Sequence, residues 1–316
     1  MRRALILAGG LGERLRPLTA RLPKPLAPVL NRPVVSWVIA QLRESGFDEI
    51  GVTAGYRGDQ LRRHFASQPS DGVELVVLDE TRPLGTGGAL CAHREFLQGE
   101  PCLVVTADML SSLDLRAMAT AYEENPTSVM VAVADQDGST WPGDTVDIDQ
   151  YGMPHYSFKP GSGQKHVKGS AGTWIVDPDV VGDLGAGEFV DFSRDVLPTL
   201  PTESFDLGVY DGGEIELFDI GTLDRLLDTN LNLAARGPSI VGGGSETKKA
   251  KGGIVVGEGV VVDESAQILA PAVIGDGVRV EAGAMIVGSV VLANSTVPAD
   301  TLVAGAVYGD IRFAGI

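Results

Sequence analysis

The chain has 316 residues, 44% of them hydrophobic, which is enough for one large domain with a core and a smaller second unit. Its 42 acidic and 25 basic residues give a net charge of −17, which argues against nucleic acid and an anionic membrane as partners. The two cysteines, Cys91 and Cys102, show neither metal nor redox spacing, so we expect a reducing compartment. The first apolar run, Ala4–Ala8, is too short for a signal sequence or a membrane span, which predicts a cytoplasmic protein.

Strand-like and helix-like segments alternate over the first hundred residues. The expected strands are Ala4–Ala8, Glu49–Ala54, Val73–Leu78 and Cys102–Thr106, and the expected helices are Val34–Gly46, Asp59–Ala66 and Gly88–Leu97. This alternation predicts an α/β fold with a Rossmann-like, largely parallel sheet and a ligand beyond the carboxyl ends of its strands.

The pattern changes from about residue 127. Strand-like runs at Val129–Ala134, Thr173–Val176 and Glu214–Phe218 alternate with loops rich in Gly, Pro and Asp, which predicts an antiparallel extension and hence a mixed sheet. Leu223–Ala235 has the periodicity of a closing helix.

The C-terminal part is a sequence repeat. Residues 237–253 have the composition of a linker. Beyond them a large aliphatic residue stands at every sixth position, namely Val256, Val262, Ile268, Ile274, Val280, Ile286 and Leu292. Hexapeptide repeats are typical of a parallel β-helix, here expected in its left-handed form with these residues pointing inward. The chain is thus expected to divide into a domain at 1–236, a linker at 237–253 and a left-handed β-helix at 254–316.

The basic residues gather near the N-terminus. Residues 1–32 hold seven of the 25 basic residues and one acid, Glu13. A cationic patch on an acidic protein predicts a site for a small polyanion, with a solvated basic face as the alternative. Gly9, Gly10 and Gly12 follow the first strand, and a backbone without Cβ atoms can approach a phosphate closely.

Two familiar phosphate loops do not fit this segment. A dinucleotide-binding turn needs a third glycine where Leu15 stands, and the prolines at 17, 23, 25 and 28 prevent the long helix that must follow. A Walker A loop needs Gly-Lys-Ser/Thr, which the sequence lacks. A nucleotidyltransferase loop remains, in which Gly9–Gly12 wraps a triphosphate, Arg14 reaches its β- and γ-phosphates and Lys24 lies near the α-phosphate.

Several motifs together resemble those of the sugar-1-phosphate nucleotidyltransferases, the NDP-sugar pyrophosphorylases. GGLGERLRPLT at 9–19 and PKPLAPVLNRP at 23–33 are similar to the family signature. PLGTGGAL at 83–90 resembles the second glycine loop, which flanks the nucleobase, and VVTAD at 104–108 and FDIGT at 218–222 resemble the two motifs that carry metal-binding aspartates. Lys159-Pro160 resembles the end of a further motif, F-x-E-K-P, and the family often carries a hexapeptide tail.

The resemblance implies that an acceptor phosphate attacks the α-phosphorus of a nucleoside triphosphate and that pyrophosphate leaves. The implied catalytic residues are Arg14, Lys24, Asp108 and Lys159. The implied nucleotide-binding residues are Leu7, Ala8, Gly9, Gly10, Gly12, Gly85 and Thr86. The acceptor would contact Gly143, Phe158, Lys159 and Ser170, and Asp108 and Asp219 would hold Mg²⁺ as cofactor.

The acceptor motifs depart from the family pattern. Phe158 replaces the Glu that commonly binds sugar hydroxyls, Ser170 replaces an Asn, and Leu217 replaces a Trp. Because these positions change while the phosphate and metal residues are kept, we expect an unusual acceptor, such as a heptose, a modified hexose or a cyclitol phosphate. The second glycine loop resembles guanylyl- and uridylyltransferases most, which favours GTP and leaves UTP, dTTP and ATP open.

Two other functions compete with this one. A catalytically idle regulatory homologue that binds nucleotide sugars would not need the retained pair Asp108 and Asp219. A hexapeptide acyltransferase usually carries a catalytic histidine, and none follows His166.

Because a short β-helix needs its ends and faces covered, we also expect a homo-oligomer.

Overall fold

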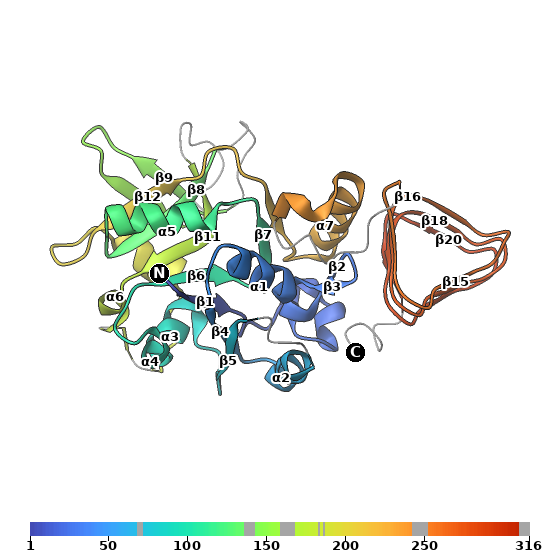
Figure 1. Cartoon of the computed structure of the whole chain (residues 1–316), viewed down its shortest axis with the longest axis horizontal. Coiled ribbons are helices and arrows are strands. Elements are labelled where there is room, and N and C mark those ends of the chain that lie inside the picture. The colour runs from blue at the N-terminus through green and yellow to red at the C-terminus, as the bar shows by residue number, and fades with distance from the viewer. Residues whose placement is uncertain are drawn as a thin grey trace.

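The computed structural model describes residues 1–67, 72–135, 143–158, 168–182, 184–185, 187–241 and 252–309. A sheet of nine strands forms the centre of the larger part (Figure 1). Strand β1 (Arg3–Leu7) lies between β4 (Glu49–Ala54) and β6 (Cys102–Thr106) and is parallel to both, and β5 (Glu74–Asp79) continues the parallel set next to β4. The predicted Rossmann-like half is confirmed.

The other half of the sheet is mixed. Strand β11 (Lys168–Val176) runs antiparallel to β6 and to β8 (Val129–Ala134), and the hairpin of β9 (Thr145–Ile148) and β10 (Pro154–Ser157) extends it. Strand β12 (Leu207–Asp211), however, is parallel to β8, so the extension is not purely antiparallel.

The strand expected at Glu214–Phe218 begins three residues later than predicted and lies outside the main sheet. The turn at Gly212 and Gly213, the latter with φ of +66°, ends β12 before this segment. The chain then forms the short β13 (Leu217–Asp219), which pairs with β7 (Met109–Ser111) outside the main sheet. The same small pair carries Asp219 to the vicinity of Asp108, whose carbonyl oxygen accepts a hydrogen bond of 3.0 Å from the Ile220 amide.

Helices cover both faces of the sheet (Figure 1). They are α1 (Val34–Glu44), α2 (Gly58–Ala66), α3 (Gly85–Ala92), α4 (Arg94–Leu97), α5 (Leu115–Glu124), α6 (Pro178–Gly182) and α7 (Leu223–Arg236). Short 3-10 turns lie at Glu13–Leu15, Leu18–Ala20, Lys24–Leu26, Leu197–Thr199 and Pro238–Val241, and a π turn lies at Phe192–Val196. Strands β2 (Pro28–Val29) and β3 (Arg32–Pro33) form a small separate ladder. Neighbouring residues of β1 face opposite cores, since Ile6 packs with the helices α1, α5 and α7 and Leu5 with α3, α4 and α6. The single helix expected at Gly88–Leu97 is two helices that meet at His93. None of the helices in these described ranges is long and apolar enough to cross a membrane.

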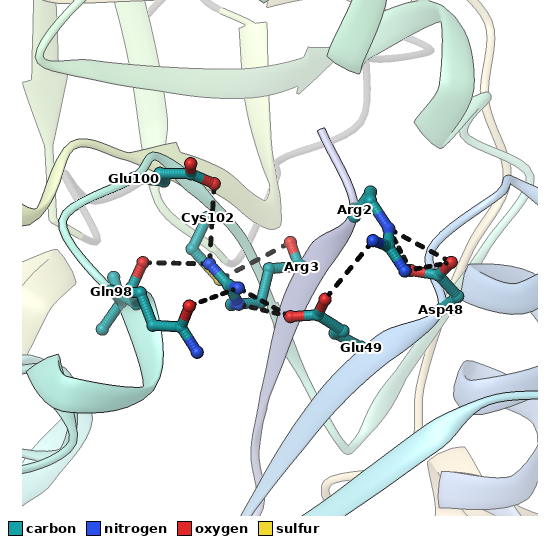
Figure 2. Close-up of polar contacts among 8 residues, drawn as sticks. Arg2, Arg3, Asp48, Glu49, Gln98, Glu100 and Cys102 are labelled. Atoms are coloured by element: carbon teal, nitrogen blue, oxygen red, sulfur yellow. Dashed lines mark hydrogen bonds and ion pairs between the residues drawn. The ribbon is translucent and has the colours of Figure 1, made fainter.

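Arg2 and Arg3 anchor the start of β1, at the end of the strand away from the glycine loop (Figure 2). Arg2 forms an ion pair of 2.9 Å with Asp48, and the Arg3 side chain donates a 2.8 Å hydrogen bond to Glu49. These two arginines therefore neutralise local carboxylates, and the polyanion patch expected from the sequence is smaller than the seven basic residues suggested.

The C-terminal strands wind into a three-sided parallel β-helix (Figure 1), which confirms the predicted hexapeptide fold. Its strands are β14 (Ile254–Val256), β15 (Val261–Val262), β16 (Gln267–Ile274), β17 (Arg279–Val280), β18 (Met285–Val291), β19 (Thr296–Val297), β20 (Leu302–Ala304) and β21 (Val307–Tyr308). The first two inward positions, Val256 and Val262, are 42% and 41% exposed, because no earlier coil lies over them among the described residues. The division at residues 236 and 254 stays a prediction.

The hexapeptide register slips before Leu292. Ile274 lies opposite Val291 rather than Leu292, and the buried interior of the β-helix contains Val291, Val297 and Val303. The expectation that Leu292 points inward is wrong, because the coil shortens by one residue there. Leu292 instead joins the core shared with the larger part of the chain.

Helix α7 connects the two parts (Figure 1). On one side its Leu233 and Ala234 share a core with Val273 and Val290 of the β-helix. On the other side the buried Asn230 accepts a 2.8 Å hydrogen bond from the Leu30 amide and donates one of 3.1 Å to the Pro28 carbonyl. The β-helix is therefore packed against the larger part of the same chain.

Candidate active site

The first glycine loop leaves β1 at its carboxyl end, where a parallel sheet presents its ligands. The Thr53 hydroxyl accepts hydrogen bonds from the amides of Ala8 and Gly9, at 2.9 and 3.2 Å. Gly12 has φ of +63°, and a Cβ there would lie 2.9 Å from Thr19 and 3.0 Å from Lys24. Only glycine suits this close return of the loop.

Lys24 forms an ion pair with Asp108. Their side chains are 13% and 31% exposed. Burial alone would raise the pKa of Asp108, but the charge and hydrogen bond of Lys24, with a hydrogen bond from Thr106, hold that pKa below its ordinary value. Asp108 is therefore a carboxylate at neutral pH.

Asp219 lies at the end of β13. One of its carboxylate oxygens accepts a 2.6 Å hydrogen bond from the Gly221 amide, and the other forms an ion pair with Arg225. Each of the two predicted metal aspartates is thus balanced by one cation.

A cavity of about 520 Å³ surrounds the first glycine loop. All of the nucleotide-binding residues expected from the sequence line it, namely Leu7, Ala8, Gly9, Gly10, Gly12, Gly85 and Thr86. Arg14, Lys24 and Asp108 line it as well. Arg14 and Lys24 are the only two members of the N-terminal basic group among the described residues that line this cavity.

A second cavity of about 930 Å³ adjoins the first. Gly143, Phe158 and Ser170, which were predicted to contact the acceptor, line it together with Asp219. The two cavities share Arg14, Thr86, Thr106, Asp108 and Asp191. Lys159, predicted to bind the acceptor phosphate, lies outside the described residues.

The second glycine loop is fixed by the segment before the π turn. The amides of Gly87 and Gly88 both donate to the Val190 carbonyl, at 2.8 and 3.1 Å, and the Phe192 amide donates to the Thr86 hydroxyl at 2.7 Å. Gly85 has φ of +71°, and a Cβ there would lie 2.4 Å from the Val190 carbonyl oxygen. The loop that lines the first cavity is therefore joined to Asp191, which lines both.

Sequence reasoning missed several lining residues. Glu80 lines the first cavity, accepts a hydrogen bond from Thr53, and has a pKa raised by burial. Arg225 and Asp191 line the second cavity. Glu80 stands three residues before the second glycine loop at 83–90, and Arg225 follows the FDIGT motif by three residues, so proximity to motifs was the available signal.

Among the described residues, no three His, Cys, Asp or Glu side chains form a ready-made metal site. Asp108 and Asp219 nevertheless line one cavity and keep carboxylate oxygens on its wall. Two protein carboxylates, completed by water and phosphate oxygens, are a set that suits a hard divalent cation. The residues present therefore fit such an ion.

Comparison with known proteins gives similar relatives over the larger part of the chain. A protein of Oryza sativa subsp. japonica named as a probable mannose-1-phosphate guanylyltransferase 3 is 27% identical over 280 residues, covering 84% of this chain and 76% of its own length. The D-glycero-alpha-D-manno-heptose 1-phosphate guanylyltransferase of Aneurinibacillus thermoaerophilus is 35% identical over 115 residues, covering 36% of this chain and 50% of its own length. A probable mannose-1-phosphate guanylyltransferase 2 of Arabidopsis thaliana is 36% identical over 143 residues, and the chain spans only 39% of its length.

Solved structures show the same fold. HddC from Yersinia pseudotuberculosis, alone and in complex with GMP-PN, aligns with TM-scores of 0.61 and 0.62 at 20% identity, covering 74% of this chain and all of HddC. A family model described as bacterial transferase hexapeptide (six repeats) matches residues 253–288. A model described as nucleotidyl transferase matches residues 3–236, close to three quarters of the sequence, and the chain belongs to this nucleotidyl transferase family.

Proposed function

We propose that this protein transfers a nucleotidyl group from a nucleoside triphosphate to a sugar 1-phosphate or a sugar-like cyclitol 1-phosphate and releases pyrophosphate. The observation that carries the proposal is the pair of cavities that share Arg14 and Asp108. One cavity holds the glycine loop and two cations, and the other holds Asp219 and the acceptor-side residues. An in-line displacement needs this arrangement, with a donor and an acceptor that meet at one point.

The chemistry needs positioning and charge balance more than a covalent intermediate. An oxygen of the acceptor phosphate forms a bond to the α-phosphorus, and the bond from the α-phosphorus to the pyrophosphate oxygen breaks. The acceptor phosphate is already ionised at neutral pH, so no general base is required. Arg14 and Lys24 would neutralise the charge that develops on the leaving pyrophosphate. Lys159 would bind the acceptor phosphate.

Asp108 and Asp219 would hold Mg²⁺, which takes carboxylate, water and phosphate oxygens. The ion, when bound, would neutralise phosphate charge and orient the triphosphate. Lys24 and Arg225 now balance these carboxylates, so both cations would become available to the substrates' phosphates once the ion replaces them.

Glu80 supports GTP as the donor. Its carboxyl group lies in the cavity of the glycine loops, and a Cβ on Gly9 would lie 2.5 Å from its oxygens. A carboxylate accepts hydrogen bonds, and guanine offers the exocyclic amine and ring N–H that can donate them. Relatives named as guanylyltransferases agree with this choice.

A release assay tests the proposal. Each of the four NTPs is combined with a panel of hexose, heptose and cyclitol 1-phosphates in the presence of Mg²⁺, and pyrophosphate is measured. We expect turnover with at least one pair and highest turnover with GTP. No pyrophosphate from any pair, under conditions in which a known enzyme of the family is active, would contradict the proposal and favour a regulatory homologue that binds without reacting.

We also propose that the protein forms a homo-oligomer through one outer face of its β-helix. The columns Gln267–Met285–Leu302 and Leu269–Val287–Ala304 of this face carry no charge, and Leu269 and Leu302 are 46% and 63% exposed. A second copy presents the same uncharged face, so a two-fold contact would cover both.

Cys91 and Cys102 are buried free thiols, which supports a reducing, cytoplasmic location.

A further inference from the structure

The acceptor cavity contains a carboxylate that is held in place by a buried phenol. The Tyr156 hydroxyl, on β10, donates a 2.6 Å hydrogen bond to one carboxylate oxygen of Asp144. Tyr156 is 4% exposed, and burial together with the neighbouring charge of Asp144 raises the pKa of its phenol. Tyr156 therefore stays protonated and keeps donating at all physiological pH values.

The backbone around this carboxylate is fixed as well. The Ser170 amide donates a 2.8 Å hydrogen bond to the Asp144 carbonyl oxygen, which ties the start of β9 to β11. The hydroxyls of Ser170 and Ser193 also hydrogen-bond the Tyr156 side chain. Asp144, Ser170 and Ser193 all line the acceptor cavity, so the polar wall is preorganised before the acceptor arrives.

Phe158 lines the same cavity and offers no hydrogen-bond acceptor. Asp144 supplies one instead. We infer that Asp144, positioned by Tyr156, reads the ring of the acceptor by accepting a hydrogen bond from one hydroxyl or ammonium group, while Phe158 contacts an apolar edge. This inference rests on the proposed function and assigns a specificity-determining residue to its acceptor site.

The charge of Asp144 defines the class of acceptor. A hydroxyl or ammonium group of the acceptor that donates to this carboxylate forms a charge-assisted hydrogen bond, which an analogue without that group loses. Sites built to hydrogen-bond a hydroxyl reject such analogues strongly. An acceptor with a carboxylate on its ring brings two negative charges together. The acceptor is therefore a neutral or amino-substituted ring with a donor at this position, and not a uronic acid phosphate.

Monodeoxy analogues of an active acceptor test the inference. Wild-type turnover is first measured with α-D-mannose 1-phosphate and α-D-glucose 1-phosphate, and then with their 2-, 3-, 4- and 6-deoxy analogues, using the best NTP. We expect a fall of about 10²-fold or more in kcat/KM at one ring position. In Asp144→Ala this preference should shrink to below about tenfold, while the KM for the NTP changes by less than about threefold.

Three further variants make the test specific. Asp147→Ala removes an exposed carboxylate of β9, the strand that begins directly after Asp144, and should keep the wild-type pattern. Tyr156→Phe should raise the acceptor KM but keep the preferred ring position, because the carboxylate remains. Asp144→Asn preserves the size of the side chain and an oxygen that accepts the Tyr156 hydrogen bond. It should raise the kcat/KM for α-D-glucuronic acid 1-phosphate by about tenfold relative to the neutral sugars, because the repulsion between two carboxylates is gone.

The outcomes separate two failures. Absence of wild-type turnover with every hexose, heptose and cyclitol 1-phosphate of the release assay contradicts the proposed function itself. An active, folded Asp144→Ala or Asp144→Asn enzyme with the wild-type deoxy pattern and the same rejection of the uronic acid phosphate overturns the role of Asp144 alone. Circular dichroism and thermal unfolding establish that each variant is folded.

Discussion

The side-chain amide of Asn31 donates a 2.7 Å hydrogen bond to the backbone carbonyl of Ile274 and so joins the loop after β2 to the second coil of the β-helix. The contact lies beside the core that Leu233 and Ala234 of α7 share with Val273 and Val290. Because α7 begins at Leu223, directly after the FDIGT segment with Asp219, the β-helix braces the element that leads out of the active site.

Deleting residues from Gly252 onward should therefore destabilise the remaining part. The deletion exposes the apolar face of α7, so we expect a lower Tm and lower solubility, with some activity retained in the fraction that stays folded. Asn31→Gly keeps the positive φ of +63° and loses only the hydrogen bond, which should cost about 0.5–1.5 kcal/mol of unfolding free energy. Calorimetry measures the Tm of both variants, and the deletion should lower the Tm more than Asn31→Gly does. An unchanged Tm after the deletion would show that the larger part of the chain does not need the β-helix for its stability.

The Lys24–Asp108 pair should be required for turnover. Asp108→Asn should lower kcat by at least about 10²-fold because one of the two carboxylates proposed to hold Mg²⁺ is lost, although the protein stays folded. Lys24→Ala and Arg14→Ala should each cost about 2–4 kcal/mol in the transition state. Steady-state kinetics should show that Lys24→Ala reduces kcat more than it weakens NTP binding. A variant that changes nucleotide affinity alone would refute the assigned role of Lys24.

Glu80 should make stability depend on pH. Its pKa is raised in the folded state above the ordinary value of 4.5 because burial disfavours the charge. The folded state thus binds the proton more tightly than the unfolded state, and stability falls as the pH rises from about 4.5 through the raised pKa. Glu80→Gln removes this loss, so its Tm should exceed that of the wild type at pH 7.5 and approach it near pH 4. A Tm difference between Glu80→Gln and the wild type that is equal at both pH values would argue against this titration. The variant should also prefer GTP over UTP less strongly than the wild type does.

Gly85→Ala should disrupt the second glycine loop. The new Cβ would meet the Val190 carbonyl oxygen at 2.4 Å and require an unfavourable φ of +71°. We expect a loss of at least about 2 kcal/mol of unfolding free energy and a higher KM for the NTP. Gly213→Ala is the matched control, since its φ is +66° but no atom lies within 4 Å of its Cβ position. Strain alone, about 1–2 kcal/mol, is expected there, without an effect on NTP binding.

The outer face of the β-helix should control assembly. Leu269→Glu with Leu302→Glu places two like charges on the proposed contact, so sedimentation should report a smaller species than for the wild type. Thr296→Glu adds a charge to a different, exposed face and should leave the assembly unchanged. A wild-type protein that sediments as a monomer at working concentration would refute the assembly proposal and leave the β-helix as a brace only.

Local patterns predicted much of this fold. Apolar runs placed β1, β4 and β6, periodicity placed α1 and α7, and the hexapeptide spacing predicted the β-helix. Helix α5 was not predicted, although Asp114 caps it with a 2.9 Å hydrogen bond and Leu115, Met118, Ala119 and Tyr122 form its buried face. That signal was present in the sequence, at helical spacing after a capping residue.

Other features depend on contacts that spacing does not encode. The parallel pairing of β12 with β8 follows from the path of the whole chain. In the β-helix, Ile274 pairs with Val291, one residue earlier than the six-residue repeat predicts. The ion pair of Arg225 with Asp219 and the hydrogen bond of Tyr156 to Asp144 need helix α7 and the β9–β10 hairpin to form first. Motifs therefore located the residues proposed to bind phosphate, whereas Asp144, proposed to contact the acceptor, was found only in the structure.

The hydrogen bonds of Asn230 to Leu30 and Pro28 span about 200 positions in the chain and have a consequence for synthesis on the ribosome. The cationic loop with Arg14 and Lys24 emerges early, whereas Asp219 and α7, which complete and hold it, emerge more than 190 residues later. Contacts this distant in sequence slow folding, since the intervening chain must be closed first. We therefore expect a nascent chain to expose the segment proposed to bind phosphate for most of its synthesis, and to bind a nucleotide there only after α7 has docked.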